Sequence, residues 1–594
     1  MVEDPKSESC SSLVRSWLSE CVGSHGRCER VSGNVIPTRL IDVGTIDGLK
    51  RPHLHRTVSD DQKIPYMTLS HCWGPDDSKI SRLTESNLEK MVDEIDESTL
   101  SKSFQDAITI TRGLNIRYLW IDALCIIQDS AEDWAIESAK MAQYYRGGKV
   151  MISALASPSA DNGILHPRTG DTNSVKISLN GTELSIRLAL EDAWTVIEDE
   201  NRDNSPVRQG ISVQPLNHRA WTLQERLFAP RIIHYTAQQL IWQCKTCIAS
   251  EDNQFELMSG GQVTTPLIDL VSLDTERSNL SRNPTRQPTI RTTGWYKLLR
   301  SYTSRQITYS SDLLPGISGL AREIQALTGA RYLAGIWDGS PTIIIRSLLW
   351  RVADYSLLRG EKPATPACNG SPSWSWASVS AEIAQKDFPD AENCRIVQPD
   401  IDPSFFLRET QMATSNPFGQ VSGGKIQFSG FVHSYTGPTT FAEFQTRKLV
   451  ERLILGDMEE QKIWEEQVVI YDNSSNIDID SHTDIKAISA VGEAQKQPEV
   501  VLDIPNEDYD FSTSDHDLLF MCRWDQELHP TDELSAEQQF LLLRRLNTKD
   551  DSKSAQGKGN WPVFERVGIV GVESPYLLDI TASEGWKRRT GIIV

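Results

Sequence analysis

The chain has 594 residues, more than one hydrophobic core usually supports, so two or three domains are expected. Hydrophobic residues make up 39% of the chain and charged residues 24%, a composition typical of folded proteins that excludes a wholly disordered chain. The net charge of −21 argues against nucleic acid as a partner, because nucleic-acid binding depends on neutralising phosphates.

The acidic segment from Met1 to Pro5 is not followed by an apolar stretch of the kind that secretion signals contain. No part of the chain approaches the roughly 18 consecutive apolar residues of a membrane span. We therefore expect a cytoplasmic protein without a membrane span. The ten cysteines are scattered, mostly among apolar residues, and we expect reduced thiols rather than disulfides.

Strand and helix signals alternate along residues 66–154 in the order that builds a parallel sheet. Apolar runs predict strands at 66–70, 118–121 and 149–152, and periodic segments predict helices at 104–114 and 131–145. Each interval is long enough for the crossover that parallel strands need. We expect the three strands to be parallel neighbours in one sheet.

The rest of the chain is less regular. Residues 231–235 and 240–243 predict a hairpin, 251–290 a linker or insertion, and 291–352 a mainly helical region. Beyond residue 425, β-branched and aromatic runs predict strands at 426–432, 467–471, 499–504 and 564–572.

Polar and aromatic residues follow two of the predicted parallel strands. The first strand continues into Ser70, His71 and Trp73, and the second into Asp122 and Gln128. In open α/β sheets, ligands bind at the carboxyl ends of the strands, so these residues are candidates for a binding site. The alternative for each residue is a structural role in a turn, a cap or the core.

Three segments resemble the sequence blocks of the fungal heterokaryon-incompatibility (HET) domain: residues 66–74, 119–129 and 218–226. The likeness reaches Trp17, Cys21, His25 and Cys28 before the blocks and 371–378 after them. Ile127 departs from the family pattern, in which an acidic residue is common. The resemblance implies allorecognition and programmed cell death, and a fold distantly similar to the TIR domain.

The expected fold class is α/β, with a TIR-like or Rossmann-like parallel sheet core, a helical extension and a β-rich C-terminal region. The expected domain limits are an N-terminal extension at 1–58, the HET domain at 59–250, a linker or insertion at 251–290, a helical region at 291–400 and an acidic β-rich region at 401–594.

We expect the residues of the three blocks to form one site. Its binding residues are Ser70, His71, Trp73, Asp122, Gln128, Arg219, Trp221 and Gln224. Some TIR domains cleave NAD, and glycosidic cleavage needs a carboxylate near a developing positive charge, which Glu137 or Glu225 would supply. The structural alternatives are a helix-surface charge for Glu137 and an ion pair with Arg219 or Arg226 for Glu225.

Cysteine chemistry gives two weaker hypotheses. Cys125 with His71 would suit a thiol nucleophile, but the apolar surroundings of Cys125 favour an inert core thiol. Cys21, His25 and Cys28, with Cys10 upstream and the pair Cys244 and Cys247 far downstream, would suit zinc, but their spacing is not a strong zinc pattern and a helix ending at a turn explains the same residues. We expect no metal and no cofactor.

Two functions remain open. The first is an effector of heterokaryon incompatibility that kills the cell after contact with a non-self partner protein. The second is a stand-alone enzyme or accessory protein of fungal secondary metabolism, which cyclises a small apolar substrate in a tryptophan-lined pocket. The sequence does not decide between them, nor whether the chain is catalytic or forms a homo-oligomer.

Overall fold

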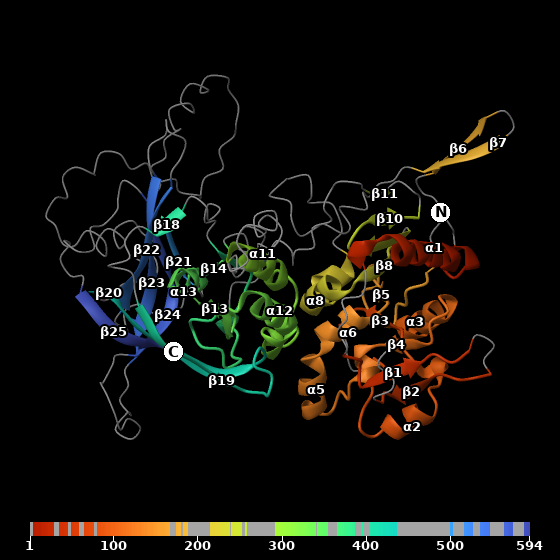
Figure 1. The fold of residues 1–594 in the computed structure, drawn as a ribbon, viewed down its shortest axis with the longest axis horizontal. Helices are drawn as coiled ribbons and strands as arrows, with labels where there is room; N and C mark the ends of the chain where they lie inside the picture. The colour runs from red at the N-terminus through yellow and green to blue at the C-terminus, as the bar shows by residue number, and fades with distance from the viewer. Residues whose placement is uncertain are drawn as a thin grey trace, which may run out of the picture. The chain divides into compact units, whose positions relative to one another are not determined.

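A computed structural model describes residues 4–28, 35–45, 49–58, 64–75, 80–166, 174–179, 182–187, 214–237, 239–251, 256–257, 292–339, 341–353, 365–385, 394–396, 404–435, 499–502, 516–526, 535–546, 563–573 and 587–594. The chain forms two compact units (Figure 1). Unit 1 comprises Met1–Asp338, Ala367–Ser371 and Gln411–Ser422, and unit 2 comprises Gly339–Pro366, Pro372–Thr410 and Gly423–Val594. Most of the predicted linker at 251–290 and the predicted strand at 467–471 lie outside the described residues.

Unit 1 is built on a nine-stranded sheet with the order β11-β10-β9-β8-β5-β3-β4-β1-β2. Its strands are β1 (Arg39–Asp42), β2 (His53–Arg56), β3 (Tyr66–Ser70), β4 (Tyr118–Trp120), β5 (Val150–Ser153), β8 (Arg231–Tyr235), β9 (Leu240–Cys244), β10 (Ile248–Ser250) and β11 (Glu256–Leu257). A separate hairpin is formed by β6 (Ser174–Leu179) and β7 (Thr182–Arg187).

The centre of the sheet is parallel, as predicted. Met67 of β3 pairs with Leu119 of β4 on one side and with Val150 of β5 on the other, and both pairings are parallel. β8 extends the parallel set beyond β5. All residues of β3 are buried, as expected for a strand covered on both faces. The predicted hairpin is confirmed, because β8 and β9 pair in antiparallel fashion.

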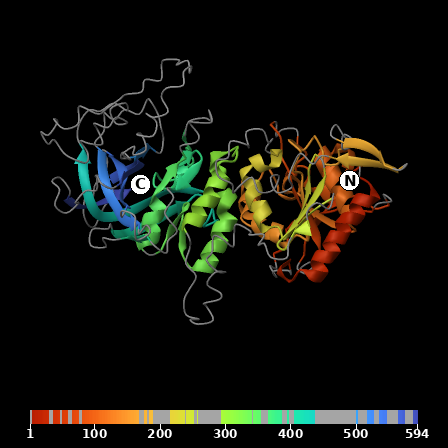
Figure 2. The same ribbon diagram turned by 90° about the horizontal axis from the view of Figure 1, so that it is seen from above.

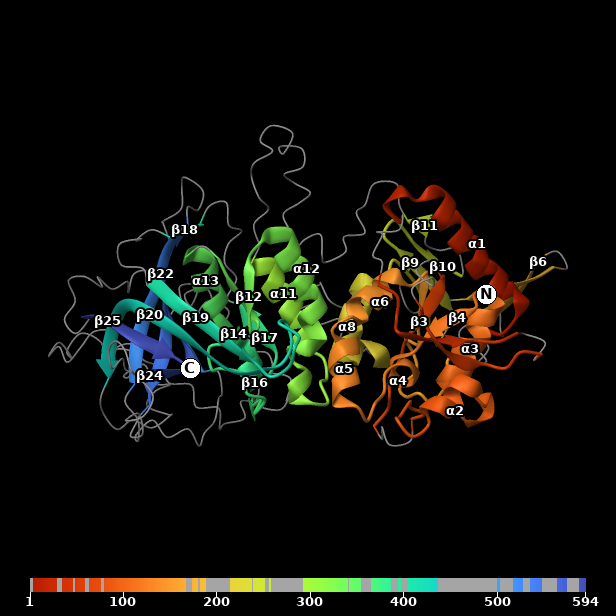
Figure 3. The ribbon, with the colours of Figure 1, turned by 60° about the horizontal axis from the view of Figure 1, so that its bottom comes forward.

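Helices cover both faces of this sheet (Figures 1 and 3). One layer contains α1 (Glu8–Ser24) and α3 (Lys102–Gly113), and the other contains α6 (Met141–Gly147) and α8 (Ala220–Phe228). β4 lies on one side of β3 and β5 on the other, so the chain runs along the sheet first in one direction and then in the other. Right-handed crossovers in opposite directions lie on opposite faces of a sheet, which agrees with the two helix layers. Two shorter helices are α2 (Leu88–Asp93) and α4 (Asp122–Cys125), and Glu97–Thr99 forms the 3-10 turn η4.

The predicted helix at 131–145 is wrong as a single element. It is two helices, α5 (Ala131–Ser138) and α6, separated at Ala139 and Lys140. Ser130 does cap α5, since its hydroxyl accepts a hydrogen bond from the Asp133 amide. At the break, the Ala139 carbonyl accepts a 2.7 Å hydrogen bond from Nη1 of Arg322, a tertiary contact that replaces a helix bond.

The remainder of unit 1 is a helical layer with its own aromatic core. It contains α11 (Thr292–Thr303), α12 (Ser318–Thr328), the 3-10 turns η7 (Ser310–Asp312) and η8 (Pro315–Ile317), and the hairpin β12 (Arg331–Leu333) and β13 (Ile336–Asp338). Trp295, Tyr332 and Trp337 pack edge to face with ring centroids 5.2–6.0 Å apart.

Unit 2 is β-rich, as predicted (Figure 2). Its main sheet has the order β18-β22-β23-β24-β25-β20-β19, and β20 also pairs with β22, so five strands form a closed ring. The strands are β18 (Cys394–Ile396), β19 (Ser404–Met412), β20 (Val421–Tyr435), β21 (Glu499–Leu502), β22 (His516–Gln526), β23 (Ser535–Arg545), β24 (Val563–Glu573) and β25 (Lys587–Ile593).

Smaller elements complete unit 2. These are α13 (Pro341–Leu348), the 3-10 turn η9 (Trp376–Ser378), and the short strands β14 (Trp350–Val352), β15 (Thr365–Pro366), β16 (Val379–Ser380) and β17 (Ile383–Gln385). Trp350 donates a 2.9 Å hydrogen bond to the Trp374 carbonyl, and both side chains are fully buried. Within the described ranges, none of the helices has the length and apolar character needed to cross a membrane.

Candidate functional site

The carboxyl ends of β3 and β4 carry the polar residues that the sequence singled out. Because the two strands are parallel, Ser70 at the end of β3 and Asp122 just after β4 emerge at the same edge of the sheet. The indole Nε1 of Trp73 donates a 3.1 Å hydrogen bond to Oδ2 of Asp122. The two loops are thus held together by a side-chain contact.

His71 lies beneath this contact and is buried. Its Nδ1 is 3.8 Å from Oδ1 of Asp122, and its ring packs edge-on against Phe104 of α3. Burial lowers the pKa of His71 to about 4, with Asp122 opposing and Arg219 reinforcing the shift. Among the residues that the structure describes, Nε2 of His71 has no hydrogen-bond partner. The imidazole is therefore neutral at physiological pH.

Arg219 joins the third sequence block to the first. It directly precedes α8, and its Nη1 donates a 2.8 Å hydrogen bond to the His71 carbonyl. Its guanidinium also lies 5.9 Å from the centre of the Trp73 ring, within range of a cation–π interaction. Trp73, Asp122 and Arg219 are each half-buried, so the cluster reaches the surface through them.

Glu225 lies on α8 at the buried side of the same cluster and is only 7% exposed. Burial and the charge of Asp122 raise its pKa to about 7, although interactions with Ser70, Arg219 and Tyr145 lower it. The side chains of Ser70 and Tyr145 lie next to this carboxyl group. A buried carboxyl group with a raised pKa beside a second carboxylate is typical of functional sites.

The second candidate carboxylate, Glu137, is in a different environment. Its Oε2 accepts hydrogen bonds from the Thr38 hydroxyl at 2.8 Å and the Tyr144 hydroxyl at 2.9 Å, and its Oε1 lies 3.3 Å from Nζ of Lys140. The side chain is 2% exposed. These contacts satisfy both oxygens and join α5, α6 and the segment before β1, which is a structural role.

The hydrogen bonds of three other predicted binding residues go to partners other than Glu225. Gln128 donates to the Asp122 and Ile126 carbonyls and supports the turn that carries Asp122. Gln224 accepts a 2.9 Å hydrogen bond from the Gly319 amide of α12. Trp221 donates a 3.2 Å hydrogen bond to Asp312, whose pKa is raised by burial against the opposing effects of this bond and of the nearby charge of Arg219.

Neither cysteine of the first two blocks suits nucleophilic chemistry. Burial raises the pKa of Cys72 to about 11 and that of Cys125 to about 12. The reactive species is the thiolate, so both side chains are core thiols at neutral pH.

Two residues close to Glu225 and Arg219 were not expected from the sequence to belong to a site. Tyr145 donates a 3.0 Å hydrogen bond to the Leu69 carbonyl and lies against Glu225. Asp312 contributes a half-buried carboxylate, whose pKa is raised mainly by its partial burial. The helical pattern could have indicated that Tyr145 faces inward from α6. Asp312 lies in an irregular segment, where no sequence pattern indicates which way a side chain faces.

A surface hollow of about 250 Å³ lies elsewhere on unit 1, between α5 and α12. It is lined by Ala135, Ile136, Ala139, Lys140, Arg322, Ser415, Asn416 and Pro417, and none of these is a predicted site residue. The predicted site is therefore a compact polar cluster of Ser70, His71, Trp73, Asp122, Arg219 and Glu225, which we call the Glu225 cluster.

Comparisons with known proteins identify one family for part of the chain. Residues 66–225 match the family model of the heterokaryon incompatibility protein (HET), a span that begins with β3 and ends at Glu225. A search of curated proteins found no match, and a search of solved structures found none. All six residues of the Glu225 cluster lie within the matched span. Residues 66–225 of this chain form a domain of the heterokaryon-incompatibility family.

Proposed function

We propose that this protein is an effector of heterokaryon incompatibility, which kills the cell after contact with a non-self partner, and that its HET domain acts through Glu225. The observation that carries the proposal is the buried carboxyl group of Glu225, with Ser70, Asp122 and Arg219 beside it where the three sequence blocks meet. A carboxyl group buried beside a second carboxylate is costly to ionise, and such groups are typical of functional sites.

The chemistry proposed for this carboxylate is cleavage of the N-glycosidic bond of NAD. Water adds to C1′ of the ribose as the bond to nicotinamide breaks, and the ring nitrogen of nicotinamide keeps the bonding electrons. The products are ADP-ribose, neutral nicotinamide and a proton, for which ionised Glu225 is the acceptor. The transition state resembles an oxocarbenium ion, which a nearby carboxylate stabilises. The distant similarity of HET domains to TIR domains, some of which cleave NAD, supports this substrate.

The neighbours of Glu225 have positioning roles in this proposal. The charge of Arg219 lowers the pKa of Glu225 and favours the ionised form that the reaction needs. Trp73 and Asp122 hold the loops that close over the carboxylate. Because Glu225 is 7% exposed, substrate has to enter past the half-buried residues Trp73 and Arg219. Contact with a partner protein is proposed to widen this entrance.

The test compares Glu225→Gln with the matched control Glu137→Gln in fungal cells, following viability and total NAD. Gln retains the volume of Glu but not its charge, so Glu225→Gln is expected to abolish both toxicity and NAD loss. Glu137→Gln removes a buried carboxylate that is satisfied by Thr38 and Tyr144 and is expected to retain both effects. Full toxicity of the parent protein with unchanged NAD would rule out NAD cleavage, and toxicity of Glu225→Gln would rule out the role of Glu225.

No observation on the described residues favours the alternative of a biosynthetic enzyme. It rested on a tryptophan-lined pocket, but seven of the 16 tryptophans are fully buried in the cores: Trp120, Trp242, Trp295, Trp337, Trp350, Trp374 and Trp376. We therefore propose the incompatibility function alone.

A further inference from the structure

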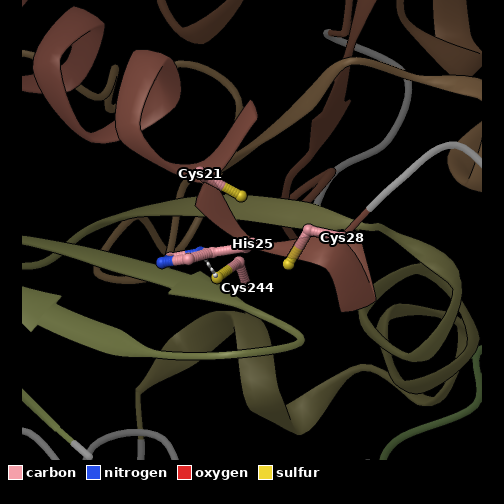
Figure 4. Close-up of side chains that lie close together, drawn as sticks. All are labelled: Cys21, His25, Cys28 and Cys244. Carbon is pink, nitrogen blue, oxygen red and sulfur yellow. Dashed lines mark hydrogen bonds between the residues drawn. The ribbon is translucent and has the colours of Figure 1, made fainter. Parts of the chain in front are cut away.

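Four side chains with metal-binding atoms, none of them part of the Glu225 cluster, come together in unit 1 (Figure 4). Cys21 lies in the last turn of α1, His25 is the residue that caps this helix, Cys28 lies in the 3-10 turn η1 (Gly26–Cys28), and Cys244 ends β9. Their ligand atoms all lie within 4.8 Å of one another. Nδ1 of His25 is 3.5 Å from Sγ of Cys244.

The donor set and its dimensions match a structural zinc site. Three thiolates and one imidazole are an established set for tetrahedral Zn²⁺, and zinc–sulfur bonds of about 2.3 Å place neighbouring sulfur atoms about 3.8 Å apart. The observed separations therefore need only a small contraction around an ion. The three thiols are buried and His25 is half-buried, so the four ligands surround a protected position.

A buried cation stands beside the thiols. Nε of Arg231, on β8, lies 3.2 Å from Sγ of Cys21, and its Nη2 donates a 2.7 Å hydrogen bond to the Cys28 carbonyl. Arg231 is only 5% exposed. Zn²⁺ with three thiolates has a net charge of −1, which the guanidinium offsets. Burial of an arginine is expensive unless an opposite charge accompanies it.

The turn after β9 adds hydrogen bonds of the kind that support zinc ligands. The Cys247 amide lies 3.3 Å from Sγ of Cys244 and donates to it, and the Thr246 hydroxyl lies 3.4 Å from Sγ of Cys28. Outer contacts of this type orient the ligands and stabilise the thiolate form. Cys247 itself is 3.6 Å from Cys244, sulfur to sulfur, but lies outside the four-residue set.

We propose that Cys21, His25, Cys28 and Cys244 bind one Zn²⁺ ion, which fastens α1 to the β9–β10 hairpin. Four protein ligands leave no open position for a water or a substrate, so the ion is structural rather than catalytic. It links the N-terminal helix to a strand more than 200 residues later, next to the packing of Trp17 against Trp242. The proposal does not depend on the function proposed for Glu225.

The experiment measures zinc in the purified full-length chain by elemental analysis. The parent protein is expected to contain one zinc per chain, and Cys28→Ser and Cys244→Ser less than a tenth of that. Two controls are expected to retain the metal: Cys10→Ser, which changes another buried cysteine of α1, and Cys247→Ser, which changes the thiol next to the set. A parent protein without bound metal would overturn the proposal. Loss of zinc in Cys247→Ser with retention in His25→Ala would overturn the assigned ligands.

A second measurement covers the case in which the serine variants do not fold. Zinc in the parent protein is exchanged for Co²⁺, and the d–d and thiolate-to-cobalt absorption bands of a tetrahedral thiolate site are expected. An octahedral cobalt spectrum would contradict the site. The proposal also predicts that all ten cysteines titrate as free thiols after denaturation with a chelator and without reductant, whereas a count of eight would indicate a disulfide in place of the metal site.

Discussion

The indole of Trp73 donates its hydrogen bond to the same carboxylate, that of Asp122, whose charge raises the pKa of Glu225. The loops after two parallel strands and the helix α8 therefore meet at Asp122. Two carboxyl groups in one partly desolvated cluster cannot both ionise without cost, and burial together with the charge of Asp122 raises the pKa of Glu225 to about 7.

Replacement of Asp122 by Asn is expected to lower the pKa of Glu225, because it removes the negative charge that opposes ionisation. The measurement compares thermal unfolding of Asp122→Asn with that of Asp122→Asn/Glu225→Gln across pH. The pH at which the difference between the two curves stops growing should be lower than for the parent protein and Glu225→Gln, because this pH follows the pKa of Glu225 in the folded state. The control is Asp129→Asn, which removes an exposed charge in the same loop and should leave this pH unchanged. The same result for both variants would show that Asp122 does not act on Glu225.

The Glu225→Gln variant is expected to be more stable than the parent protein at pH 8. The pKa of Glu225 rises from 4.5 to about 7 on folding, so the folded state binds a proton more tightly than the unfolded state. Stability from this group is complete below pH 4.5 and is lost as the pH rises through 7. At about 1.4 kcal/mol per pKa unit, the difference at pH 8 is on the order of 3 kcal/mol and disappears near pH 4. A variant that unfolds at lower temperature than the parent at pH 8 would contradict this.

Asp42→Asn is expected to destabilise unit 1 at neutral pH and to have little effect near pH 2. Oδ2 of Asp42 accepts hydrogen bonds from Nη2 of Arg117 at 2.7 Å and Nζ of Lys50 at 2.8 Å. Burial raises the pKa of Asp42, but the hydrogen bonds from Arg117 and Lys50 lower it by more, so the pKa is about 2. The stabilisation is present above pH 4 and is lost as the pH falls towards 2. Because both cations are partly exposed, we expect a cost of about 1–2 kcal/mol, measured by urea unfolding at pH 7 and pH 2.5.

Gly319→Ala is expected to destabilise the contact between α12 and α6. A Cβ at this position would overlap the side chain of Ala142 and lie 2.7 Å from Oε1 of Gln224. Overpacking of this kind costs about 1–3 kcal/mol. The matched control is Gly23→Ala, in α1, where a Cβ meets nothing within 4 Å and alanine should stabilise the helix by about 0.5–1 kcal/mol. Equal unfolding temperatures for the two variants would contradict the close packing.

The parallel centre of the sheet was predictable because each of its strands is a local apolar run followed by a helical segment. β1 and β2 were not predicted, since they are four residues each and are defined by antiparallel pairing with β4 and with each other. The split of the helix at Ala139 was not predicted either, because its cause is a hydrogen bond from Arg322, 183 residues away. Such contacts leave no periodicity in the sequence.

The candidate site likewise combines residues that the local sequence predicts with residues whose role depends on distant contacts. Ser70, Trp73 and Asp122 were found because parallel strands place their carboxyl ends at one edge. Whether Glu137 or Glu225 faced that edge depended on burial and partners, which the helical pattern does not reveal. Likewise, Cys21 and Cys28 had no clear spacing signal, because the fourth residue of the proposed metal site, Cys244, lies on β9 in a different part of the chain.

The extent of the nine-stranded sheet has a practical consequence for work with the isolated domain. A fragment cut to the family span of residues 66–225 would keep only β5, β3 and β4 of this sheet. The outer sides of β4 and β5, now paired with β1 and β8, would become bare strand edges able to recruit other chains. Such a fragment would therefore be prone to aggregate in the host cell, whereas one spanning residues 4–257 would retain both flanks of the sheet.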